Sequence, residues 1–317
     1  MNREIDLSVS TYGVARQYKY DVAILPWGAT EPHNLHLPYM TDCILSHAVA
    51  VDAAERALKE YGVRCMVLPP VMMGSQNPGQ RDLPFCIHYH YETQYAILRD
   101  IVDSLSHQGM RRLLIINGHG GNSFKQMIRD IEACPLTPTP IPSRGEGSLN
   151  TLSNEPSEAN QAPLPSGDWG LQSSHRCGCG PTKGSESPIR DGGQEGGGFL
   201  LASAEWFKMA PAKDYFEQPG DHADEIETSV MMHYHPELVR LEEAGEGRSR
   251  QFAIPALREG KVWMPRHWTL VTEDTGIGNP ALSTAEKGRR FADACADGFA
   301  QFLRDFAKVN SQSDLYE

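Results

Sequence analysis

The stretch DVAILPWGATEPHNLHLPYMTD, residues 21–42, carries an apolar run directly into a group of acidic residues and histidines. The run Asp21–Trp27 is too short for a helix and predicts a buried β-strand. Glu31 and His33 follow it, and because they are two apart in an extended segment, their side chains project the same way. The next segment, Thr41–Glu60, has Ala, Leu and Val at helical spacing. The stretch therefore predicts a strand, a polar loop and a helix, in that order.

The rest of the chain repeats this alternation of strands and helices. Three more short apolar runs predict strands at Arg64–Leu68, Arg112–Asn117 and Phe199–Ala204. Further helical patterns cover Tyr91–Gln108, Asn122–Ala133 and Ala285–Val309. Strands that alternate with helices predict βαβ units and an α/β fold with a largely parallel sheet. Since ligands bind outside the carboxyl ends of such strands, the residues directly after each strand are the candidates for chemistry.

The composition excludes several classes of protein. The chain has 317 residues and a net charge of −12, which argues against a nucleic acid or an anionic membrane as partner, since both require a basic face. We find neither an N-terminal secretory pattern nor an apolar run near the ~18 residues of a membrane span. Seven cysteines without a dense framework fit a reducing compartment, and we expect a cytoplasmic protein.

The interval 135–198 differs from its surroundings. It is rich in Pro, Gly, Ser, Asn and Glu and lacks apolar periodicity, so we expect a low-complexity, disordered insertion within a single domain that spans residues 1–317. It contains His175-Arg176-Cys177-Gly178-Cys179, but no further ligands follow nearby at the spacing of a zinc knuckle.

Two later motifs also carry residues suited to chemistry. The sequence NGHGGN, Asn117–Asn122, directly follows a predicted strand and presents His119 among glycines, which permit close backbone approach. A serine esterase with an HGGG-type loop is the competing interpretation, but the chain has no G-x-S-x-G nucleophile motif. The sequence HADEIETS, His222–Ser229, opens a predicted helix. The helix dipole accounts for Asp224 and Glu225 but not for a histidine and a second glutamate, which favour acid–base work or metal binding.

Together, three motifs resemble the creatininase (creatinine amidohydrolase) family. They are PWGATEPHNLHLPYMTD at Pro26–Asp42, NGHGGN at Asn117–Asn122 and HADEIETS at His222–Ser229, and the loop Asn77–Gln80 resembles an active-site loop of that family. The resemblance covers residues 15–133 and 199–305, roughly. It implies a three-layer α/β/α fold and a homo-oligomer, commonly a hexamer.

The same resemblance implies two divalent ions, which are Zn, Mn or Fe. The family's metal ligands correspond here to Glu31, His33, His119 and a bridging Asp42. Creatininase itself carries a glutamate two residues after this histidine, where the present chain has Gly121. Glu225 is the predicted replacement for that carboxylate.

The predicted activity is hydrolysis of a C–N bond in a small-molecule, creatinine-like cyclic amide or amidine by metal-activated water. His222 or Glu227 would pass a proton to the leaving nitrogen, and Asn122 with nearby backbone N–H groups would steady the oxyanion. The motifs fit equally a deformylase or a peptide-amide hydrolase, because specificity resides in the pocket walls. A catalytically degenerate metal-binding scaffold stays open because of Gly121. A two-metal phosphoesterase fits the ligands, but no arginine clamp or phosphate loop adjoins the motifs.

Overall fold

The computed structural model describes residues 2–133 and 198–317. The predicted insertion, residues 135–198, lies outside the described residues except for Gly198, and so does the His175–Cys179 motif. Within the described ranges, no helix is both long enough and apolar enough to cross a membrane.

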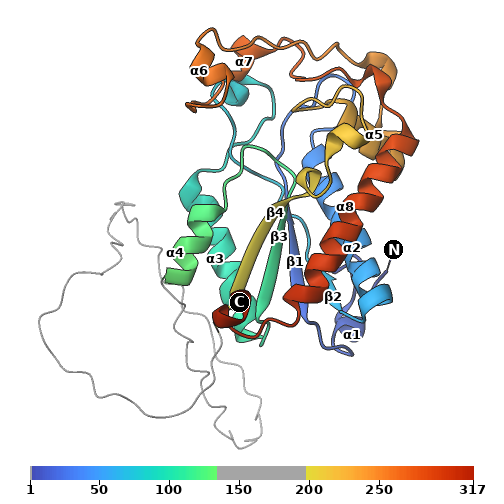
Figure 1. Cartoon of the computed structure of the whole chain (residues 1–317), viewed down its shortest axis with the longest axis vertical. Coiled ribbons are helices and arrows are strands. Elements are labelled where there is room, and N and C mark those ends of the chain that lie inside the picture. The colour runs from blue at the N-terminus through green and yellow to red at the C-terminus, as the bar shows by residue number, and fades with distance from the viewer. Residues whose placement is uncertain (1, 134–197) are drawn as a thin grey trace, which may run out of the picture. The chain divides into compact units, whose positions relative to one another are not determined.

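Four parallel strands form the central sheet (Figure 1). Across the sheet they lie in the order β2 (Cys65–Val67), β1 (Val22–Trp27), β3 (Arg112–Asn117) and β4 (Leu200–Glu205). The register places Ala23 beside Met66 on one side and beside Leu113 on the other. Every residue of β1 is buried, as expected of a central parallel strand. The predicted parallel sheet is confirmed.

The described helices include the five that the sequence predicted, some of them shorter than expected, and three helices of four residues each that it did not predict. They are α1 (Tyr12–Ala15), α2 (Thr41–Tyr61), α3 (Tyr91–His107), α4 (Lys125–Ala133), α5 (Glu225–Tyr234), α6 (Pro255–Arg258), α7 (Trp268–Val271) and α8 (Ala285–Phe306). Short 3-10 turns are η1 (Gln80–Asp82), η2 (Trp206–Lys208), η3 (Ala212–Asp214), η4 (Pro236–Leu238), η5 (Leu241–Glu243), η6 (Pro280–Leu282) and η7 (Gln312–Leu315). Helix α2 stops at Gly62, whose φ of 69° is the left-handed conformation that glycine adopts without strain. Helix α8 is capped by Thr284, whose hydroxyl accepts the Lys287 N–H at 3.2 Å.

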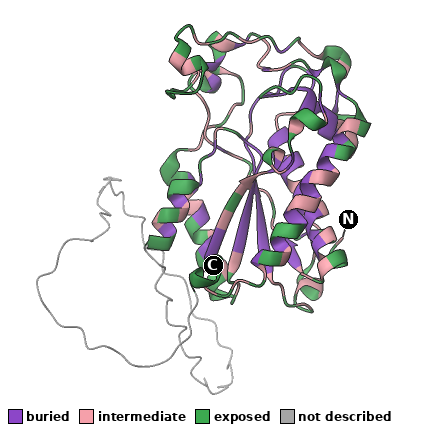
Figure 2. Ribbon diagram, viewed as in Figure 1, coloured by how far each residue is buried: buried purple, intermediate pink, exposed green. Residues whose placement is uncertain are grey.

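Successive residues of the strands face opposite helical layers. Val22 and Ile24 of β1 pack with α2, α5 and α8. Ala23, Leu25 and Trp27 pack with α3 and α4 on the other face. Figure 1 shows the two groups of helices on opposite sides of the sheet, and Figure 2 shows that the strands between them are mostly buried, apart from the later residues of β4. The structure therefore confirms the three-layer α/β/α fold.

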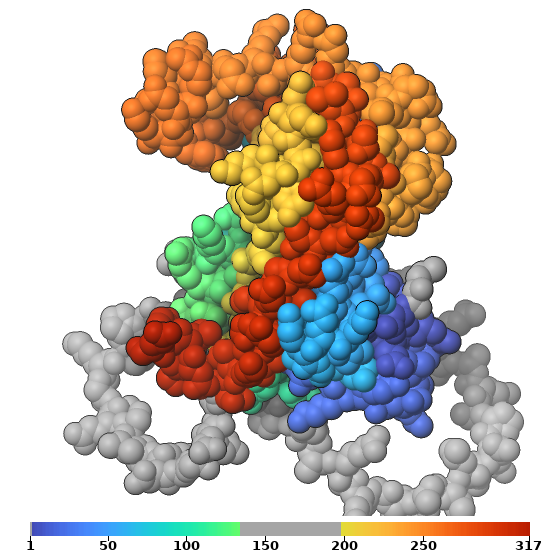
Figure 3. All heavy atoms as spheres, turned by 45° about the vertical axis from the view of Figure 1, so that its right-hand side comes forward, coloured from blue at the N-terminus to red at the C-terminus, as the bar shows by residue number. Residues whose placement is uncertain are grey.

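Helix α8 supports the layer that carries α2 and α5. It packs against both helices, and Figure 3 shows it running across this face of the molecule beside α2. Phe291 of α8 is fully buried, and its ring meets those of Trp206, Tyr215 and Phe216 at centroid distances of 6.0, 5.4 and 5.1 Å. Because edge-to-face aromatic packing adds to the burial of apolar area, this cluster fixes α8 on the segment that follows β4.

We predict that Phe291→Ala lowers the free energy of unfolding by about 3–5 kcal/mol, because the vacated ring leaves a cavity that the surrounding rings only partly fill. Phe302→Ala on the same helix is the control, since that side chain is 38% exposed and leaves no enclosed cavity. Urea unfolding of both variants measures the difference. Equal losses would contradict the structural role assigned to the Phe291 cluster.

Candidate metal centre

The loop after β1 brings three of the predicted residues to one end of the sheet. Glu31 and His33 lie in the loop, Asp42 lies in the first turn of α2, and all three are buried. Asn34 takes a φ of 52°, and its side chain both donates to and accepts from Gly245, at 3.1 and 2.8 Å. These bonds fix the turn that presents His33 to the interior.

Two glycines in the loop after β3 let that loop approach its neighbours. A Cβ atom at Gly118 would overlap the backbone carbonyl of Asp42, and one at Gly121 would overlap the Ser75 carbonyl and the His119 ring. Because neither glycine has a side chain, the loop can approach closely, and His119 lies directly against the segment 31–42 that carries Glu31 and Asp42. The predicted strand-end clusters therefore come together.

Asn122 joins three loops rather than facing the cavity with a free amide. Its Nδ2 donates to the Gly28 carbonyl and to Asn117 Oδ1, both at 3.1 Å, and its Oδ1 accepts the Ser75 N–H at 3.0 Å. Both amide hydrogens are engaged, so the predicted oxyanion contact lacks a donor from this side chain. The same bonds hold the segment out of the helix, and α4 therefore begins at Lys125 instead of Asn122.

The third motif adds His222 from a loop that is held at two points. His222 pairs with Ile277 through backbone hydrogen bonds in both directions, at 3.1 and 2.8 Å. Two residues later, the Asp224 carboxylate caps α5 by accepting the N–H groups of Ile226 and Glu227 at 3.0 and 3.1 Å. The cap and the pairing together orient the start of α5 toward the first loop.

In each of three buried histidines, one ring nitrogen is hydrogen-bonded to a backbone carbonyl and the other faces a carboxylate. His33 Nδ1 meets the Glu31 carbonyl at 3.0 Å, His119 Nε2 meets the Ser75 carbonyl at 2.7 Å, and His222 Nε2 meets the Pro32 carbonyl at 2.9 Å. Since a carbonyl only accepts, each of these nitrogens carries a proton. In the neutral ring the second nitrogen then has a free lone pair, which is the arrangement found in metal-binding histidines.

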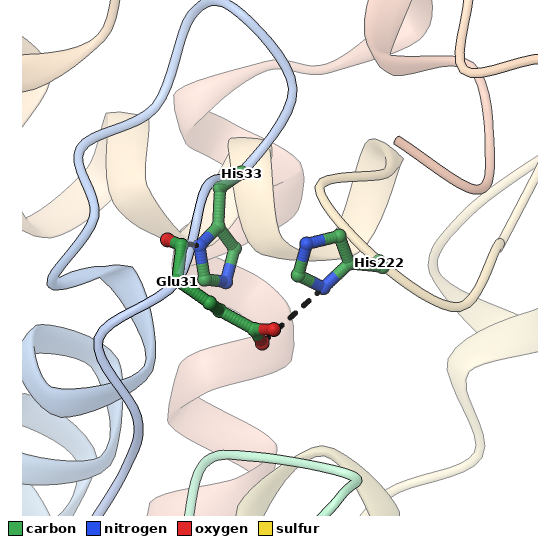
Figure 4. A group of neighbouring side chains, drawn as sticks. All are labelled: Glu31, His33 and His222. Carbon is green, nitrogen blue, oxygen red and sulfur yellow. Dashed lines mark hydrogen bonds and ion pairs between the residues drawn. The ribbon is translucent and has the colours of Figure 1, made fainter. Parts of the chain in front are cut away.

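Those second nitrogens converge on Glu31 and Asp42. His119 Nδ1 lies 2.7 Å from Glu31 Oε1 and 3.2 Å from Asp42 Oδ2. His33 Nε2 lies 3.0 Å from Asp42 Oδ1, and His222 Nδ1 lies 3.8 Å from Glu31 Oε1. Figure 4 shows Glu31, His33 and His222 turned toward one another. Gln80 donates to the remaining Glu31 oxygen, Oε2, and so orients this carboxylate.

Burial and charge act against each other at this cluster. Burial alone would raise the pKa of Glu31, but His119 and His222 outweigh it and hold the pKa below its usual range. Burial would lower the pKa of His33, whereas the adjacent Asp42 carboxylate raises it to about 10. Burial, followed by the charge of His33, lowers the pKa of His222. The cluster thus favours ionised carboxylates and a neutral His222.

The donor set fits a divalent cation. Glu31 Oε1 and Asp42 Oδ2 are enclosed, and neither accepts a well-directed hydrogen bond within the described part of the chain. Buried carboxylate oxygens without a donor are costly, and a cation satisfies them. Ligand atoms about 2.1 Å from a tetrahedral ion lie about 3.4 Å apart, which the separations of 2.7–3.8 Å bracket. The groupings that suit an ion are Glu31 with Asp42 and His119, Glu31 with His33 and His222, and His33 with Asp42 and Glu227.

The two glutamates at the start of α5 have different surroundings. Both oxygens of Glu225 are occupied, one by Lys287 Nζ of α8 at 2.6 Å and the other by the Gln218 N–H at 2.7 Å. This carboxylate ties α5 to α8, and the structure does not bring it to the cluster as the predicted ligand. Glu227 does lie with His33 and Asp42.

A cavity of about 760 Å³ opens beside the cluster. Its wall includes Glu31, His119 and His222, together with Lys125 and Trp268. The Trp268 ring stands edge-on to His222 at 5.1 Å with an interplanar angle of 90°. The backbone N–H of Trp268 donates to the Pro78 carbonyl at 2.7 Å, which holds this wall on the segment that leads to Gln80.

The partners that orient the ligands were not predicted from the sequence. Gln80 lay in the loop Asn77–Gln80 that the family resemblance pointed to, so a signal for it existed. No sequence signal marks the Ser75 and Pro32 carbonyls, because a backbone carbonyl is present at every position. Nothing in the sequence placed Trp268 against His222.

Comparisons with known proteins agree with the fold and the motifs. The family model "Creatininase: Creatinine amidohydrolase" matches residues 9–303. A mycofactocin precursor peptide peptidase of Mycobacterium ulcerans is 24% identical over 287 residues, which are 89% of this chain and 84% of that protein. A crystal structure from Bacteroides fragilis, named a putative creatinine amidohydrolase, is 48% identical with a TM-score of 0.77 and full coverage of both chains. Zinc and manganese forms of creatininase, at 19% and 17% identity and TM-scores of 0.62, cover 97% and 96% of this chain and all of theirs, and share the fold.

We predict that Gly118→Ala destabilises the fold by about 1–3 kcal/mol, because the new methyl group must displace the first turn of α2 at Asp42. Gly120→Ala in the same loop is the matched control, since a Cβ atom there meets nothing within 4 Å. Thermal and urea unfolding of the two variants gives the comparison. A Gly118→Ala protein as stable as Gly120→Ala would mean that the two loops do not approach as closely as described.

Proposed function

This chain belongs to the creatininase family, and we propose that it is a metal-dependent hydrolase of a carbon–nitrogen amide bond. One observation carries the proposal. His33 and His119 each hold a protonated ring nitrogen on a backbone carbonyl and direct the other nitrogen at Glu31 or Asp42, and each of these carboxylates has an enclosed oxygen without a hydrogen-bond donor in the described chain. Isolated ion pairs do not require that histidine arrangement, whereas metal ligation does.

Glu31, Asp42 and His119 are the residues that we propose to hold the first ion. A mixed set of carboxylates and imidazole suits Zn, Mn or Fe. When bound, such an ion polarises a carbonyl oxygen and lowers the pKa of water. Gln80 and the Ser75 carbonyl keep Glu31 and His119 in the ligating orientation.

His222 is the proposed proton carrier. Its Nε2–H is held by the Pro32 carbonyl, so its free Nδ1 faces the cluster and accepts a proton from the attacking water. The imidazolium then donates this proton to the leaving nitrogen. The Trp268 ring packs against the His222 ring in a T-shaped contact, and both residues are buried. The position of Asn122 leaves oxyanion stabilisation to other groups.

The proposed substrate is a small cyclic amide or amidine of the creatinine type. The relative from Bacteroides fragilis, which matches this chain over its full length, supports that choice by its name. A peptide amide is the second candidate. The cavity of about 760 Å³ exceeds what a single small ring requires, and the mycobacterial relative that shares 287 aligned residues bears the name of a peptidase. Formamides, which a deformylase would cleave, belong in the same assay.

We predict that chelation abolishes hydrolysis of the true substrate among creatinine, a formamide and a short peptide amide, and that Zn²⁺ or Mn²⁺ restores it. His119→Ala is expected to lower both ion retention and kcat/KM by more than about 100-fold, because a ligand is lost rather than a supporting contact. His107→Ala, on the exposed end of α3, is the control. Elemental analysis and kinetics are the measurements. Full activity in His119→Ala, or turnover that resists chelation, would refute the proposal.

A further inference from the structure

We propose that Glu227 supplies the carboxylate of a second ion site, which it forms with His33 and Asp42 beside the site of Glu31 and His119. This inference deepens the proposed function and rests on it. Gly121 has no side chain, so the extra metal-binding carboxylate must come from another residue. The sequence suggested Glu225 for this role, and we assign it to Glu227. Asp42 would bridge the two ions.

The orientation of Asp42 is that of a bridging carboxylate. Its Oδ1 lies 3.0 Å from His33 Nε2, and its Oδ2 lies 3.2 Å from His119 Nδ1. Each oxygen therefore faces a different histidine, and each histidine has its other nitrogen held by a backbone carbonyl. Two-metal sites use one carboxylate in this way, with the ions about 3.5–4 Å apart.

Glu227 completes the half of the cluster that lacks a terminal carboxylate. One of its oxygens lies within 4.8 Å of both the His33 and the Asp42 ligand atoms. The Ala223 N–H donates to Glu227 Oε2 at 2.6 Å, which orients the side chain and leaves Oε1 with a free ligating position. The first half already has such a carboxylate in Glu31. With Glu227, each half has a histidine, a terminal carboxylate and one oxygen of Asp42.

The other two sources of a carboxylate are excluded by contacts. At position 121 even a methyl group would overlap the Ser75 carbonyl and the His119 ring, so no ligand side chain fits there. Glu225 is fully buried and is bound through both oxygens, to Lys287 and to the Gln218 N–H. Among the described residues, Glu227 is the remaining carboxylate grouped with His33 and Asp42.

The charges also favour two ions over one. Glu31, Asp42 and Glu227 bring three carboxylates to one largely buried cluster. When all three carboxylates are ionised, a single divalent cation leaves them with a net negative charge, which is costly away from water. Two cations exceed the carboxylate charge by one, and this surplus suits the polarised oxygen of an amide substrate.

The test compares Glu227→Gln with Glu225→Gln, two isosteric changes two residues apart on one helix. Each purified protein is loaded with MnCl₂, dialysed and analysed for manganese by mass spectrometry and by electron paramagnetic resonance. We expect two ions and an exchange-coupled spectrum in the natural protein and in Glu225→Gln. We expect one ion and an uncoupled spectrum in Glu227→Gln. A merely structural role of Glu227 would not convert one spectrum into the other.

Two ions in Glu227→Gln, or one ion in the natural protein, would overturn the inference. If Glu227→Gln does not fold, Glu227→Asp keeps the charge but withdraws the oxygen by one methylene, and the second ion should then bind at least about 10-fold more weakly. Unchanged affinity in that variant would equally overturn it. A natural protein with two ions but no amide hydrolysis would instead contradict the proposed function and leave the second site standing.

Discussion

The bond between a histidine ring and a backbone carbonyl is the constraint on which the site depends. It occurs at three histidines, where the acceptors are the carbonyls of Glu31, Pro32 and Ser75. Because the acceptor is backbone, the tautomer and direction of each ring are set by the course of the loops rather than by another side chain. The contacts that keep these loops in place therefore also keep the second ring nitrogens directed at the carboxylates.

The loops are held by contacts that have no chemistry of their own. Asn122 links the segments that contain Gly28, Ser75 and Asn117, and Gly118 lets the loop after β3 touch the start of α2. On the other side, Asp224 caps α5 while Glu225 ties that helix to α8 through Lys287. The parallel sheet supplies the common edge, and these braces bring residues from three distant parts of the chain onto it. The contacts that stabilise the fold are thus the same contacts that set the geometry of the site.

The sequence predicted the fold well because its signals were local. Short apolar runs bounded by polar turns placed the strands, and apolar residues at helical spacing placed the longer helices. The convergence of Glu31, His33, Asp42 and His119 also followed, since strand ends meet at one edge of a parallel sheet. The choice between Glu225 and Glu227 did not follow. Two residues turn about 200° on a helix, so one glutamate faces the cluster and the other faces α8. The ion pair of Glu225 with the distant Lys287 determines which glutamate faces α8. Asn122 shows the same limit, because its partners lie 94 and 47 positions away.

The most direct test of a metal centre at this place is anomalous X-ray diffraction, recorded on both sides of the zinc absorption edge from crystals grown with zinc. The account predicts anomalous density between Glu31, Asp42 and His119, in contact with the Asp42 carboxylate and with His119 Nδ1. Crystals with zinc bound elsewhere and only water or protonated side chains at this cluster would contradict it.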